Sequence, residues 1–82
     1  MGEFGARFKE CRVAAGMNQQ EAAAASGVTQ QAISLYELDK REPTAYVIIA
    51  MAQAYGVSID YLLGIEEPTN GLIVNTIIGS EE

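Results

Sequence analysis

The chain has 82 residues, of which 49% are hydrophobic and 20% are charged, and it contains one cysteine and no histidine. This composition suits a single small globular domain and excludes a globally disordered chain. With one cysteine and no histidine, neither the common zinc sites nor the Ser–His and Cys–His catalytic centres can be built within one chain. We therefore expect no enzymatic activity, no bound metal and no cofactor.

The charge balance is acidic, which on electrostatic grounds does not favour binding to nucleic acid. Five basic residues face eleven acidic ones, for a net charge of −6, whereas basic residues normally carry the contacts to phosphates. All five basic residues lie within positions 7–41, and four of the eleven acidic residues stand at positions 66, 67, 81 and 82. Much of the negative charge therefore belongs to the C-terminal tail.

Neither a membrane span nor a secretory signal is evident. No apolar run approaches the roughly 20 residues that cross a bilayer, and the N-terminus lacks a basic segment followed by an apolar one. We expect a cytoplasmic protein without membrane contact. The single cysteine, Cys11, has no intramolecular disulfide partner, and its place in an apolar pattern predicts a core position.

A first helix is predicted over residues 3–15, because Phe4, Phe8, Cys11 and Ala15 recur at helical spacing. Gly16 follows at the position where helices commonly end.

The next two helices are predicted from their caps. Asn18 is a favourable N-cap, and Glu21 stands three residues later, as a capping box requires. This second helix stops at Ser26–Val28, and Thr29 caps a third helix over residues 30–38. Two helices joined by a short turn that contains glycine form a helix-turn-helix unit.

Two further helices complete the predicted domain. Thr44 caps a helix over residues 45–55, and Ser58 caps a short one that runs to residue 63. Five short helices joined by turns with glycine predict a compact all-α bundle over residues 1–64.

The last stretch, residues 65–82, has a different character. Residues 66–71 have the composition of a linker and turn, and residues 72–78 are rich in β-branched residues, which predicts a strand. A lone strand needs a partner. It either folds back on its own domain or pairs with its symmetry mate as a dimer ribbon.

Many spaced residues follow one known pattern. They are Phe8, Arg12, Gly16, Met17, Gln19, Glu21, Ala23, Gly27, Val28, Thr29, Ile33, Ser34, Glu37, Arg41, Pro43, Ala52, Tyr55, Gly56, Val57, Leu62, Leu63 and Gly64. Through these positions, residues 4–64 closely resemble the Cro/phage-repressor helix-turn-helix family. The resemblance implies a five-helix, lambda-repressor-like DNA-binding domain, to which we add the short C-terminal strand.

The resemblance also implies which residues contact DNA. Base-reading positions cluster at the start of the third helix, and they are Thr29, Gln30, Gln31, Ser34 and Leu35. Glutamine can bind adenine through two hydrogen bonds, so the two glutamines favour A·T pairs. The residues expected at backbone phosphates are Asn18, Gln19, Lys40, Arg41 and Tyr46.

Two further roles are implied. Arg12 and Glu37 resemble the ion pair that ties the first helix to the end of the third. A dimer surface is expected at the fifth helix and the tail, through Tyr61, Ile65, Leu72, Ile73, Val74, Ile77 and Ile78.

The sequence departs from the family pattern at four positions. Ala22 and Ser26 stand where large aliphatic residues are usual, and we expect Phe4 and Phe8 to fill that space. Asp39 replaces the customary loop glycine, and Glu42 adds an acid beside the loop expected at phosphate.

The implied function is that of a transcriptional regulator, most simply a repressor, which binds double-stranded DNA as a homodimer on a palindromic operator. An alternative is a protein-interaction module, antitoxin or antirepressor of the same fold, with weak or no DNA binding and a protein partner at the tail. The low positive charge and Leu35 favour this alternative.

Overall fold

The computed structural model describes residues 4–65, which form five helices and no strand. The helices are α1 (Gly5–Ala14), α2 (Gln19–Ser26), α3 (Gln30–Glu37), α4 (Ala45–Tyr55) and α5 (Ile59–Leu62). The predicted all-α fold is therefore confirmed for these residues. The predicted strand at residues 72–78 lies outside them.

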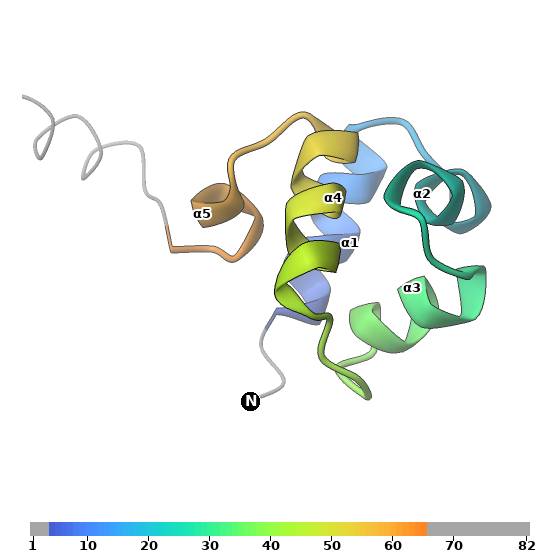
Figure 1. Cartoon of the computed structure of the whole chain (residues 1–82). Helices are drawn as coiled ribbons and strands as arrows, with labels where there is room; N and C mark the ends of the chain where they lie inside the picture. The colour runs from blue at the N-terminus through green and yellow to red at the C-terminus, as the bar shows by residue number, and fades with distance from the viewer. Residues whose placement is uncertain (1–3, 66–82) are drawn as a thin grey trace, which may run out of the picture.

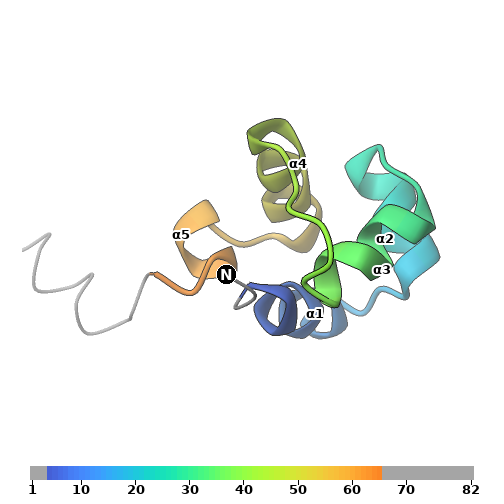
Figure 2. The ribbon, with the colours of Figure 1, turned by 90° about the horizontal axis from the view of Figure 1, so that it is seen from below.

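The helices are arranged with the helix-turn-helix unit at one end. Both views show α2 and α3 at one end of the molecule, α5 at the other, and α1 and α4 between them (Figures 1 and 2). This arrangement separates the segment expected to contact DNA from the segment expected to contact a second subunit.

Local capping explains where the helices begin. Asn18 Oδ1 accepts a hydrogen bond from the Glu21 amide at 2.7 Å, and the Glu21 carboxylate accepts one from the Asn18 amide at 2.9 Å. This is the predicted capping box. The side chains of Thr29 and Thr44 cap α3 and α4 in the same way. These bonds satisfy amide groups that the first turn of a helix leaves without a partner.

The largest fully buried side chains of the core come from four helices, one from each. Phe8, Ile33, Met51 and Leu62 are fully buried and come from α1, α3, α4 and α5 respectively. Burying each side chain of this size contributes about 1.5–3 kcal/mol. The remaining helix, α2, contributes small residues instead, so that it can pack closely on α3 and α4.

One expectation about the core is wrong. Phe4 was expected on the buried face of the first helix, but its side chain is 42% exposed. It precedes α1 as the N-cap residue and stacks on Phe8, with 6.3 Å between the ring centroids. Phe8 alone enters the core, and it is 2% exposed.

Two small residues of α2, at positions where the family usually has large aliphatic residues, are buried. Ala22 is fully buried and Ser26 is 7% exposed. The hydroxyl of Ser26 has no hydrogen-bond partner among the described residues. A buried hydroxyl without a partner costs about 1–3 kcal/mol, so Ser26 is a destabilising residue in this core.

Candidate nucleic-acid interface

The first turn of α3 presents polar side chains to solvent. Thr29, Gln30 and Gln31 are exposed, whereas Ala32 and Ile33 on the opposite side of the helix are buried. The helix is thus anchored along one face and free along the other. A free polar helix face is the geometry that a major groove about 12 Å wide accepts.

The other two expected base-reading residues are less accessible. Ser34 and Leu35 are partly buried.

Gly27 ends α2 with a φ of 74°, a left-handed conformation that costs glycine little, and so sets the turn between the two helices.

A buried polar network fixes α3 relative to α1. The guanidinium of Arg12 binds the Glu37 carboxylate twice, from Nε to Oε2 at 2.6 Å and from Nη2 to Oε1 at 3.1 Å. The side chains are only 10% and 5% exposed. Arg12 Nη1 also donates to the Met17 carbonyl at 2.9 Å, so the network includes the segment before α2. The hydrogen bond to Glu37 raises the pKa of Arg12.

Two of the five residues expected at phosphates are already engaged within the protein. Gln19 Nε2 donates to Glu37 Oε1 at 3.1 Å, and the side chain of Asn18 belongs to the capping box. Gln19 therefore supports α3 through the carboxylate that also pairs with Arg12.

The other three expected phosphate residues are exposed. Lys40 and Arg41 lie in the loop between α3 and α4, and neither side chain takes part in an ion pair or a hydrogen bond with the described residues. Tyr46, in the first turn of α4, is 85% exposed. These three side chains are available to an external partner.

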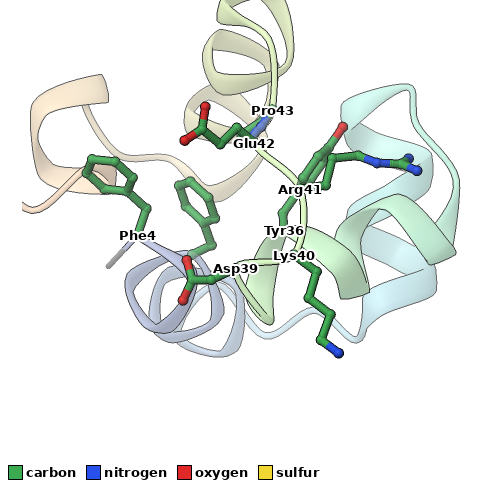
Figure 3. A pocket seen from close by; sticks show the side chains of 8 residues that line it. Phe4, Tyr36, Asp39, Lys40, Arg41, Glu42 and Pro43 are labelled. Carbon is green, nitrogen blue, oxygen red and sulfur yellow. The ribbon is translucent and has the colours of Figure 1, made fainter. Parts of the chain in front are cut away.

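The acidic residues of this loop face a different side. Figure 3 shows the Asp39 and Glu42 carboxylates directed toward Phe4, whereas Lys40 and Arg41 extend away from them. Together with Phe8, Tyr36 and Pro43, these residues line a pocket of about 250 Å³. Within residues 4–65, the Glu42 carboxylate forms no ion pair with either basic side chain of the loop.

Sequence reasoning missed the contact of Asp39. This residue has a φ of 61°, the one positive value among the described non-glycine residues. Its Oδ1 accepts a hydrogen bond from the Gly5 amide at 2.9 Å. The unusual residue at the customary glycine position was the available signal, but its partner lies 34 positions away.

The end of the molecule away from α3 carries a second missed contact. Arg7 Nε donates to the Tyr61 carbonyl at 2.8 Å, and its guanidinium lies 4.1 Å from the Tyr61 ring centroid. Tyr61 and Ile65, both expected at a dimer surface, are 41% and 63% exposed. Ile49 on α4 and Ile59 on α5 are also exposed, at 41% and 40%.

Two buried titratable groups, Cys11 and Tyr55, have raised pKa values, which favour their neutral forms. Burial raises the pKa of the Cys11 thiol, which makes it a poor nucleophile. Burial, with a further contribution from the charge of Glu37, raises the pKa of Tyr55 to about 12. The Tyr55 hydroxyl has no hydrogen-bond partner among residues 4–65.

Within the described residues, no group of three or more Cys, Asp or Glu side chains is placed to hold a metal ion. None of the five helices is both long and apolar enough to cross a bilayer.

Known sequences contain the same domain. The family model HTH_3, described as helix-turn-helix, matches residues 8–62. The SPbeta prophage-derived uncharacterized HTH-type transcriptional regulator YonR of Bacillus subtilis strain 168 is 40% identical over 60 residues, which cover 73% of this chain and 56% of the relative. The HTH-type transcriptional regulator ImmR of the same strain is 41% identical over 64 residues, which cover 78% and 50%. This chain spans about half the length of these curated relatives.

Known structures have the same fold. The restriction-modification controller protein C.AhdI from Aeromonas hydrophila is 29% identical, with a TM-score of 0.69 over 72% of this chain and 89% of that chain. The P22 c2 repressor, solved in complex with a synthetic operator, is 29% identical, with a TM-score of 0.72 over 80% of this chain and all of that one. With the family model matching most of the described residues, this chain belongs to the Cro/C1-type helix-turn-helix family of transcriptional regulators.

Proposed function

We propose that this chain is a sequence-specific DNA-binding repressor that acts as a homodimer on a palindromic operator. The observation that carries the proposal is the exposed polar first turn of α3, held on the molecule by the buried Arg12–Glu37 pair. The likeness to the P22 c2 repressor, a protein solved on its operator, supports this reading of α3.

The proposed base-reading residues are Thr29, Gln30, Gln31, Ser34 and Leu35. Gln30 and Gln31 are the exposed side chains with the greatest discriminating power, because a glutamine amide can bind both N6 and N7 of adenine. Leu35 contacts a thymine methyl group in this proposal, which is the role open to an apolar side chain in the major groove.

The proposed phosphate contacts come from Lys40, Arg41 and Tyr46. Asn18 and Gln19 support the interface from within, because their side chains already bind Glu21 and Glu37. With about three phosphate contacts in each subunit, log affinity should fall against log salt with a slope of roughly −5. This slope is shallow for a repressor. Because few contacts reach the phosphates, more of the specificity depends on the base contacts of the two glutamines.

The proposed dimer forms at the end of the molecule that carries α5. Tyr61 and Ile65 contribute exposed apolar surface there, and the tail residues 72–78 pair with their symmetry mates as a strand. A twofold axis between subunits places two α3 helices in successive major grooves about 34 Å apart. Binding of such a dimer at a promoter represses by occluding it.

Base preference at single positions tests the α3 assignment. Gln30→Ala and Gln31→Ala should each relax the preference at one position of the half-site, with a loss of about 1–3 kcal/mol for the preferred base. Gln53→Ala is the matched control, because Gln53 is an exposed glutamine on α4. Unchanged selectivity in both α3 variants would show that these side chains do not read bases.

A second candidate function is a protein-interaction module of the same fold. The net charge of −6 favours it, because it opposes binding to phosphates. This candidate predicts a folded protein with no salt-dependent affinity for any duplex, and a tail that binds a protein partner.

A further inference from the structure

The loop after α3 begins with a hydrogen-bonded helix end. The Asp39 amide donates to the Tyr36 carbonyl at 3.1 Å, and the Lys40 amide donates to the Leu35 carbonyl at 2.9 Å. This pair of bonds defines a Schellman motif, in which the residue at C′ adopts the left-handed conformation. Asp39 occupies that position, with a φ of 61°. Glycine would adopt this conformation at lower cost.

The Asp39 carboxylate joins this loop to the start of α1. The N-cap residue of α1, Phe4, supplies no side-chain cap. Asp39 Oδ1 instead accepts the hydrogen bond of the Gly5 amide at 2.9 Å. A carboxylate at the N-terminus of a helix is also favoured by the helix dipole.

The contact between the two segments is close. Gly5 is buried, and a Cβ atom at this position would clash with the Glu37 carbonyl and lie 2.8 Å from Asp39 Oδ2. Only a residue without a side chain lets α1 approach the end of α3 in this way. Gly5 therefore allows the close approach because it has no side chain, and the Asp39 carboxylate accepts the hydrogen bond of the Gly5 amide.

We infer that Asp39 is a positioning residue for DNA binding. By binding the Gly5 amide, its carboxylate holds the loop so that Lys40 and Arg41, the next two residues, face the phosphate backbone. A carboxylate beside a phosphate-binding loop lowers affinity through its charge, and its conformation is unfavourable for a residue with a side chain. In this proposal, the hydrogen bond to the Gly5 amide offsets both unfavourable effects of Asp39. This inference rests on the proposed function.

Two substitutions separate the hydrogen bond from the charge. Asp39→Asn and Asp39→Gly both remove the negative charge, and both residues tolerate the left-handed conformation. Only asparagine keeps an oxygen that can accept the Gly5 hydrogen bond. The pair therefore isolates the effect of the acceptor on DNA binding.

The measurement is the affinity for the selected operator duplex over a range of salt concentrations. For the dimer, Asp39→Asn should keep the wild-type log–log slope, and Asp39→Gly should have a slope shallower by about 2–4, because each of two subunits loses one or two phosphate contacts. In the Asp39→Asn protein, Lys40→Ala should reduce the slope by about 2. In the Asp39→Gly protein, Lys40→Ala should change it little, because that contact is already lost.

Backbone ¹⁵N relaxation of the free protein gives a second readout that does not depend on DNA or on overall stability. The amides of Lys40 and Arg41 should become more mobile in Asp39→Gly than in Asp39→Asn at a temperature where both are folded. Equal salt slopes and equal relaxation in the two variants would overturn the inference while the proposed function stands. Failure of the wild-type chain to bind any duplex would overturn both.

Discussion

The side-chain amide of Gln19 donates a hydrogen bond to Glu37 at 3.1 Å, and the same carboxylate binds Arg12 at 2.6 Å. Three segments, α1, the start of α2 and the end of α3, therefore converge on one buried carboxylate. The orientation of the helix proposed to enter DNA depends on this carboxylate.

The first prediction concerns this ion pair. Glu37→Ala should lower the free energy of unfolding by about 3–5 kcal/mol, because it leaves the Arg12 charge buried without its partner. Combining Arg12→Met with Glu37→Leu should recover much of the loss, since an apolar pair has no charge to desolvate. Urea unfolding measures both. A double variant as unstable as Glu37→Ala would contradict this explanation.

The second prediction concerns alkaline stability. Tyr55 has a pKa of about 12 in the folded protein, against an ordinary value of 10.0. As the pH rises from 10 to 12, the unfolded chain releases this proton and the folded protein retains it, so the free energy of unfolding decreases by up to about 2–3 kcal/mol. Tyr55→Phe should remove this part of the decrease. Tyr46→Phe, which alters an exposed tyrosine, should leave it intact; identical alkaline profiles for wild type and Tyr55→Phe would refute the assignment.

The third prediction concerns Ser26. Ser26→Ala should raise the free energy of unfolding by about 1 kcal/mol, because it removes a buried hydroxyl that has no partner in the described residues. Thermal or urea unfolding provides the measurement. Thr29→Ala is an instructive comparison, because it removes a hydroxyl that caps α3 and should cost about 1 kcal/mol. A destabilised Ser26→Ala protein would mean that the hydroxyl is satisfied in solution.

The fourth prediction concerns the proposed dimer. Arg7→Ala should weaken dimerisation about tenfold, because the hydrogen bond and the ring contact to Tyr61 that hold α5 are lost. Lys9→Ala removes the same charge from an exposed position on α1 and is the control. Sedimentation equilibrium measures both constants. Equal dissociation constants for the two variants would exclude a role for Arg7 in presenting α5.

The helices could be predicted from the sequence because their signals are local. Asn18 and Glu21 form the predicted capping box within four residues, and Thr29 and Thr44 begin the helices that were expected after them. The Arg12–Glu37 pair came from the family resemblance rather than from any spacing along the chain. The caps could therefore be predicted from neighbouring residues, and the ion pair from two residue types that match the family pattern.

The contacts that the sequence did not reveal join distant residues. Gly5 and Asp39 are 34 positions apart, and Arg7 and Tyr61 are 54 apart. No periodic pattern indicates such a pair, because each depends on how α1 lies against the end of α3 and against α5. The exposure of Phe4 was misjudged for the same reason. Helical spacing placed Phe4 in line with Phe8, but α1 begins at Gly5, one residue after Phe4.

Selection of binding sites from a random duplex pool, at low and at moderate salt, tests the central claim most directly. We predict that the full chain recovers a short palindrome at both salt concentrations, with A·T-rich half-sites whose centres lie about one helical turn apart. Failure of the folded protein to enrich any sequence at either concentration would contradict the account and leave the protein-interaction module as the function to pursue.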